Sequence, residues 1–222
     1  AELMGAGAQF AEIFAGDAVP LTLPYDVPAN QFMNLEGKKI SGSRNWAVWG
    51  RDALTRYDAD ALRYYLTVNM PETKDSDWDW AEFVARNNNE LVATWGNLAN
   101  RVLAFCYKNW EGYVPSFEGA ETAPLRDADK QLLATIENGF NTVGAELEAV
   151  HLRAALGEAM KLATAVNVSL DVNAPWTALK TDKAAAALTV YTALKAIDSL
   201  KVMFAPFLPS TCEKLHTFFG YE

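Results

Sequence analysis

The chain has 222 residues, of which 50% are hydrophobic, and a formal net charge of −9. Length and composition indicate a globular protein of one large or two small domains, and exclude an intrinsically disordered chain. This excess of acidic residues excludes a protein that acts mainly through non-specific contacts between basic side chains and phosphates.

Residues 1–36 have the pattern of an α/β region. A helix is expected near residues 9–14, followed by strand-like runs at 19–23 and 31–35. These elements are too few to form a sheet of their own. We therefore expect them to be the last part of a domain that begins before Ala1.

A polar loop follows at residues 36–45, here called the lysine–serine loop, with the sequence Glu-Gly-Lys-Lys-Ile-Ser-Gly-Ser-Arg-Asn. From Lys38 to Arg63 there are six Lys or Arg against three Asp, a basic island in an acidic chain. Loops of small residues, hydroxyls and lysines are suited to approach phosphates. An ordinary solvated surface turn would have the same composition.

From Gly50 onward the pattern is helical. Short helices are predicted at 51–57 and 59–66, the second with Asp58 as its N-cap. After a connector at 71–77, Asp77 or Asp79 can cap a long helix. Its apolar residues recur at spacings of four and three on one stripe, namely Leu91, Trp95, Leu98, Val102 and Phe105.

Asn97 and Arg101 are four residues apart on this long helix and therefore project from the same side. A planar amide beside a guanidinium makes a hydrogen-bonding edge suited to a planar ligand such as a nucleic-acid base. The alternative is a solvated amide next to an ordinary surface arginine.

Four further helical segments are predicted at about 124–139, 141–168, 183–204 and 209–219, with no strand between them. Long helices joined by modest loops indicate an antiparallel helix bundle. The fold class expected for the chain is therefore mainly α, with a short α/β tail in front of the bundle.

Trp176 stands where a loop enters a short helix, directly after Asn173, Ala174 and Pro175. A tryptophan at such a junction can be a core plug or an exposed surface on which a base stacks. If it approaches Asn97 and Arg101, stacking and edge recognition meet in one pocket, as the reading of unpaired RNA bases requires.

The remaining residues with possible chemistry favour packing. Cys106 and Cys212 lie in helical apolar patterns, which indicates buried thiols in a reducing compartment. With no CxxC and no His/Cys cluster, no metal site is expected. Neither a signal peptide nor a transmembrane helix is expected. Packing is also the role predicted for the tryptophans outside these sites: Trp46, Trp49, Trp78, Trp80 and Trp110.

Several separated stretches resemble one protein family. Residues 24–32 and 35–43 resemble the approach to the KMSKS loop of methionyl-tRNA synthetases, and 58–66 is similar to the segment after that loop. The helix at 97–101 and the Asn-Ala-Pro-Trp loop at 173–176 look like the elements that read the anticodon in this family. The likeness extends over nearly the whole chain.

The resemblance implies a class I synthetase. In such enzymes a Rossmann-type domain activates methionine with ATP and passes it to tRNA, and a helical C-terminal domain reads the CAU anticodon. Residues 1–79 would then be the end of the catalytic domain with a small helical connector. Residues 80–222 would be the anticodon-binding helix bundle.

The family's functional residues map onto three sets in this chain. The implied catalytic residues are Lys39, Ser41 and Ser43; the implied ATP-binding residues are Lys38, Lys39 and Arg44; the implied anticodon-binding residues are Asn97, Arg101 and Trp176. Gly42 stands where the motif has its second lysine. Either Lys38, Lys39 or Arg44 supplies that charge, which we favour, or the loop is catalytically weaker.

The HIGH motif and the methionine pocket of the family are absent from these residues. We therefore expect a C-terminal portion that binds tRNA-Met but cannot by itself form methionyl-adenylate. ATP with Mg²⁺, and methionine, would bind only in a full-length, cytoplasmic enzyme; no cofactor and no membrane partner are expected for this portion. The alternatives are a related class I synthetase for leucine, isoleucine or valine, and a helical protein-interaction module without an RNA partner.

Overall fold

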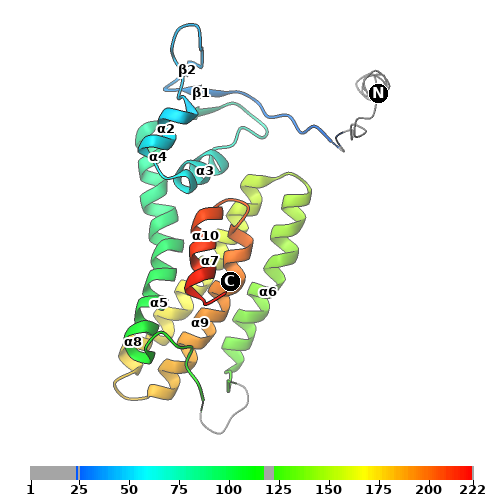
Figure 1. Cartoon of the computed structure of the whole chain (residues 1–222). Helices are drawn as coiled ribbons and strands as arrows, with labels where there is room; N and C mark the ends of the chain where they lie inside the picture. The colour runs from blue at the N-terminus through cyan, green and yellow to red at the C-terminus, as the bar shows by residue number, and fades with distance from the viewer. Residues whose placement is uncertain (1–23, 25, 118–122, 222) are drawn as a thin grey trace, which may run out of the picture. The chain divides into compact units, whose positions relative to one another are not determined.

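The computed structural model describes residues 24, 26–117 and 123–221 (Figure 1). Gln31–Glu222 form one compact unit. The helix predicted at 9–14 and the strand predicted at 19–23 lie outside the described residues. In the described part a small sheet is followed by a helix bundle, which confirms the predicted fold class.

The sheet has three short strands in the order β2-β1-β3: β1 (Met33–Leu35), β2 (Lys38–Lys39) and β3 (Ser76–Trp78). β1 and β2 form an antiparallel hairpin whose two turn residues, Glu36 and Gly37, have φ values of 50° and 71°. β1 pairs with β3 in parallel. Of these strands the sequence indicated only β1, because two or three residues carry no readable alternation.

Two short helices cover this sheet, α2 (Gly50–Arg56) and α3 (Ala59–Val68). The predicted cap is confirmed, since Asp58 accepts a hydrogen bond from the backbone N–H of Asp60 at 2.9 Å. Sheet and helices enclose a small apolar cluster: Leu35, Ala53, Leu62, Tyr65, Trp78 and Phe83.

The long helix is present, but it is not α-helical throughout. It consists of α4 (Trp80–Arg86), a π-helix η1 (Asn87–Gly96) and α5 (Asn97–Trp110). Asp79 caps it by accepting from Glu82 N at 2.7 Å. The apolar stripe is confirmed, with Trp95, Leu98 and Val102 all buried. The π-helix was not predicted, because apolar spacings of four and three suit either helix.

The bundle consists of α6 (Asp127–Glu148), α7 (Leu152–Asn173), α9 (Lys183–Phe204) and α10 (Pro209–Phe218), with the short α8 (Pro175–Ala178) between α7 and α9. These helices lie side by side with the long helix (Figure 1). α9 is apolar on most of its surface and is buried at the centre, as such a pattern requires.

The predicted break between 139 and 141 is wrong. α6 continues through Gly139 and ends at Glu148, and the chain turns at 149–151. Gly139 is buried within the helix, where a Cβ would lie 2.4 Å from Cδ1 of Leu162 and 3.0 Å from Sδ of Met203. The glycine therefore allows close helix packing and does not end the helix.

Both cysteines are free and buried, as predicted. Burial raises the pKa of the Cys106 thiol and raises that of Cys212 to about 12, so both thiols stay protonated at neutral pH.

The division of the chain into two domains at residue 79 stays a prediction.

Candidate functional site

Trp176 and Arg101, 75 positions apart in the sequence, are in contact in the structure. The guanidinium Cζ of Arg101 lies 4.6 Å from the centroid of the indole ring, within the range of a cation–π interaction. The Trp176 side chain is not sealed in the interior, because 38% of its surface is exposed. The void beneath the pair, about 10 Å³, is too small for a ligand, so a planar ligand would approach from the solvent side.

A left-handed turn presents the indole to solvent. α7 ends at Asn173, and Ala174 has φ 35° and ψ 64°, which is unusual for a residue with a Cβ. Pro175 is buried at the first position of α8, as predicted, and anchors the next residue at the surface. Residues 173–176 are called the Trp176 turn below.

Asn97 is the first residue of α5 and is exposed, one helical turn before Arg101. The long helix therefore brings the amide and the guanidinium to one side, and the Trp176 turn adds the aromatic ring. The structure thus brings Arg101 and Trp176 into contact, and Asn97 lies on the same side of α5, one turn before Arg101.

Asp171 is a site residue that was not predicted from the sequence. Its Oδ1 accepts a hydrogen bond from Nη2 of Arg101 at 2.8 Å, and its side chain is 64% exposed. The carboxylate thereby holds the guanidinium over the indole. The only sequence signal is its position in the last turn of α7, and that does not reveal a partner 70 residues away.

The lysine–serine loop is closed by a pair of backbone hydrogen bonds. Ser41 N donates to Trp46 O at 2.8 Å, and Trp46 N donates to Ser41 O at 2.9 Å. The Trp46 indole N–H also donates to Leu35 O at 3.0 Å, which ties the loop to strand β1. Trp46 thus supports the loop, and the general packing role predicted for it is too broad.

The loop presents its cations on two aromatic rings. Nζ of Lys38 lies 5.0 Å from the centroid of Trp46, and Nζ of Lys39 lies 5.7 Å from that of Phe32. Arg44 is exposed, and the hydroxyls of Ser41 and Ser43 lie 3.2 Å apart. The predicted loop residues therefore gather at one surface.

The structure leaves room for a side chain at Gly42. A Cβ there would meet only Cη2 of Trp49, at 3.6 Å, which is an ordinary contact. The loop could therefore hold a lysine at this position, and its absence is a property of the sequence and not of the fold.

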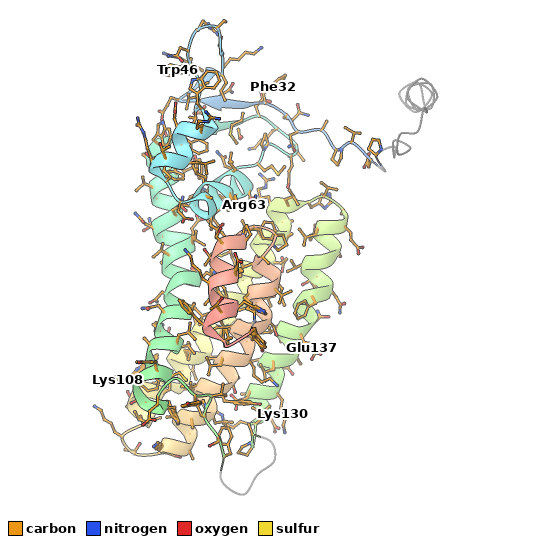
Figure 2. All side chains as sticks on the ribbon, in the orientation of Figure 1. Phe32, Trp46, Arg63, Lys108, Lys130 and Glu137 are labelled. Carbon is orange, nitrogen blue, oxygen red and sulfur yellow. The ribbon has the colours of Figure 1, made fainter. Side chains whose placement is uncertain are left out.

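The two sets of residues are well separated along the long helix: the lysine–serine loop lies beside its N-terminal end, whereas Asn97 and Arg101 lie in its C-terminal half. Figure 1 shows β1 and β2 at one end of it and α8 at the other, and in Figure 2 Trp46 marks the first end and Lys108 of α5 the second. The loop and the Asn97–Arg101–Trp176 set are therefore separate sites.

The described residues have neither a membrane-spanning helix nor a cluster of metal ligands. No helix among them is long and apolar enough to cross a membrane. In residues 24, 26–117 and 123–221, no three His, Cys, Asp or Glu side chains are grouped so that they could hold a metal ion.

Comparison with known families gives two matches that together extend over most of the chain. Residues 9–103 match the family model described as class I tRNA synthetases (M), and residues 119–222 match the anticodon binding domain of methionyl tRNA ligase. This chain belongs to the methionyl-tRNA synthetase family. The resemblance stated for the sequence is thereby confirmed, and the family matches do not favour a leucine, isoleucine or valine synthetase or an unrelated interaction module.

Curated relatives and solved structures agree with this family. The chain is 52% identical over 201 residues to the methionine–tRNA ligase of Roseiflexus castenholzii, a match over 90% of this chain and 33% of that protein. It is 49% identical over 220 residues to the ligase of Chloroflexus aggregans, over 98% of this chain and 36% of that protein. The chain thus spans about a third of these relatives.

Among solved structures, the Mycobacterium tuberculosis methionyl-tRNA synthetase in complex with methionyl-adenylate matches with a TM-score of 0.79 and 26% identity, over 87% of this chain and 38% of that one. Its apo form matches with a TM-score of 0.76 and 24% identity, over 87% and 37%. The fold of these synthetases therefore extends over most of the chain.

Proposed function

We propose that this chain is the tRNA-reading part of a methionine–tRNA ligase and that it recognises the CAU anticodon of tRNA-Met. The observation that carries the proposal is the stack of Arg101 on a half-exposed Trp176 beside Asn97. The matched anticodon-binding family supports it. In the full-length protein, this binding would serve ATP-dependent attachment of methionine to tRNA in the cytoplasm.

The chemistry of the site suits unpaired bases. The exposed part of the indole offers a surface on which a base can stack, an interaction worth about 1–3 kcal/mol per base. Asn97 offers both a donor and an acceptor, whereas Arg101 offers only donors, so together they can bind the polar edge of a base. With a net charge of −9, the chain offers few phosphate contacts, and affinity should depend mainly on the bases.

The lysine–serine loop, which lies beside the N-terminal end of the long helix, would act on the triphosphate of ATP. Its cations Lys38, Lys39 and Arg44 and the hydroxyls of Ser41 and Ser43 are donors of the kind that phosphates need, so the residues fit the group. Bound ATP would supply the adenylate that activates methionine. The described residues contain no carboxylate cluster to hold Mg²⁺, and we assign it no residue.

The test is the binding of this chain to an RNA stem-loop that carries CAU, measured by fluorescence anisotropy. Trp176→Ala should weaken binding by about 1–3 kcal/mol, roughly 5- to 150-fold, because the stacking surface is lost. Trp176→Phe should retain part of the affinity, since it keeps a smaller aromatic ring. A stem-loop of the same length without CAU should bind the wild-type chain more weakly.

Trp49→Ala serves as the matched control. This tryptophan is also exposed, at 51%, but it lies beside the lysine–serine loop and should not alter binding. If stem-loops with and without CAU bind equally, or if Trp176→Ala binds like the wild type, the proposal is wrong.

A further inference from the structure

Arg126, which precedes α6, joins three elements that are distant in the sequence. Its Nε and Nη2 donate to the two carboxylate oxygens of Asp129 at 2.7 and 2.8 Å. Its Nη1 donates to Oδ1 of Asn173 at 2.8 Å, and Nη2 also donates to Oγ1 of Thr189 on α9 at 3.1 Å. Because Asp129 and Thr189 are 2% and 3% exposed, the guanidinium is held in one orientation.

Asn173, the first residue of the Trp176 turn, connects Arg126 to that turn. The side-chain oxygen of Asn173, Oδ1, accepts the hydrogen bond from Arg126, and its Nδ2 donates to Ser169 O at 2.8 Å. Both polar atoms of the side-chain amide are therefore bonded. The next residue, Ala174, is in the left-handed region, where a residue with a Cβ needs support from its surroundings. The arginine therefore stabilises the last turn of α7 just where the backbone is strained.

We propose that Arg126 is a positioning residue for RNA reading: through Asn173 it holds the Trp176 turn in the conformation that presents the indole. This inference rests on the function proposed above. Arg126 acts through the turn and not by contact with the RNA. Asp129 and Thr189 orient the guanidinium of Arg126. In this way buried residues of the bundle determine the position of the exposed Trp176 ring.

The experiment measures the affinity of the 222-residue chain for the CAU stem-loop in Arg126→Met, Arg126→Lys and Trp176→Ala variants. Arg126→Met should weaken binding about fivefold, because the turn loses its support. Arg126→Lys should weaken it nearly as much, since one ammonium keeps the charge but cannot join the three partners. In the Trp176→Ala background, Arg126→Met should have no further effect beyond about 1.5-fold.

Two further variants separate positioning from charge and from loss of folding. Arg86→Met also removes an arginine held by two carboxylates, those of Glu82 and Glu90, but far from the turn, and should leave binding within about twofold of the wild type. Asn173→Leu leaves the Arg126–Asp129 pair intact and should reproduce the loss seen in Arg126→Met. Thermal unfolding confirms that each variant is folded at the assay temperature.

The outcomes distinguish the two proposals. If Trp176→Ala weakens binding but Arg126→Met and Asn173→Leu do not, the positioning role is wrong and the proposed function stands. An equal loss from Arg126→Met with and without Trp176 would mean direct contact with RNA and would also overturn the inference. If the wild-type chain shows no CAU preference, the proposed function fails and this inference fails with it.

Discussion

At the scale of single residues, two glycines of α6 differ in what surrounds them. Gly139 faces Leu162 and Met203, and an added Cβ would lie 2.4 Å from the nearest Leu162 carbon. Gly144, five positions later in the same helix, has nothing within 4 Å of that position. The same substitution should therefore have opposite effects at the two sites.

We predict that Gly139→Ala destabilises the chain by about 1–3 kcal/mol, because the methyl group would displace the ends of the Leu162 and Met203 side chains from their packed positions. Gly144→Ala should stabilise it by about 0.5–1 kcal/mol through helix propensity alone. Urea denaturation followed by circular dichroism measures both. Stabilisation by Gly139→Ala would mean that the helices are less closely packed at this point than the structure shows.

At the scale of elements, α3 and the loop after it hold the ends of three bundle helices. Asp60 Oδ2 accepts from Thr211 N in the first turn of α10 at 2.6 Å, and Glu72 Oε1 accepts from Arg153 N in the first turn of α7 at 2.9 Å. Arg63 donates to the carbonyls of Pro206 and Phe207, just after α9, at 2.6 and 3.0 Å. Acids thus contact helix N-termini and a cation contacts a C-terminus, the arrangement that helix dipoles favour.

From this arrangement we predict that Asp60→Asn destabilises the chain by about 1–3 kcal/mol, since Asp60 is 2% exposed and its charge-assisted bond to α10 would be weakened. Asp58→Asn, two residues earlier, is the matched control. It should change stability by less than about 0.5 kcal/mol, because asparagine caps a helix as well as aspartate does. Equal effects of both variants in thermal or urea unfolding would contradict the assigned role of Asp60.

At the scale of the whole molecule, the lysine–serine loop lies at the N-terminal end of the helix formed by α4, η1 and α5, and Arg101 lies 21 residues from the first residue of that helix, Trp80. A helical stretch of 21 residues is roughly 30 Å long, several times the screening length at physiological salt. In the isolated chain each site should therefore bind its ligand independently.

We accordingly predict that the double variant Lys39→Ala, Arg44→Ala leaves the affinity for the CAU stem-loop within about twofold of the wild type at 0.15 M salt. The same anisotropy titration provides the measurement, and a repeat at low salt reveals any residual long-range attraction. A tenfold loss at 0.15 M salt would show that the RNA also contacts the lysine–serine loop.

Much of the helical architecture could be predicted from the sequence, because helix formation depends on local spacing and caps. The stripe through Trp95, Leu98 and Val102 and the caps Asp58 and Asp79 are all present. The strands β2 and β3 could not be predicted, because two or three residues carry no readable alternation and β3 pairs with β1 across 43 residues. The prediction of a helix break near Gly139 was wrong because this glycine is set by a non-local contact. It lies against Leu162 of α7 and Met203 of α9, where a larger side chain would not fit.

For the candidate site, the sequence alone determined which residue types are available and which of them share a face, as with Asn97 and Arg101. It also determined the family, because the motifs stand in a fixed order along the chain. The contacts of Arg101 with Trp176 and Asp171, and of Arg126 with Asn173, depend on the tertiary structure and could not be predicted from the sequence. Local spacing fixes the direction of a side chain on its own helix, whereas contacts across 47 to 75 residues depend on how the helices pack.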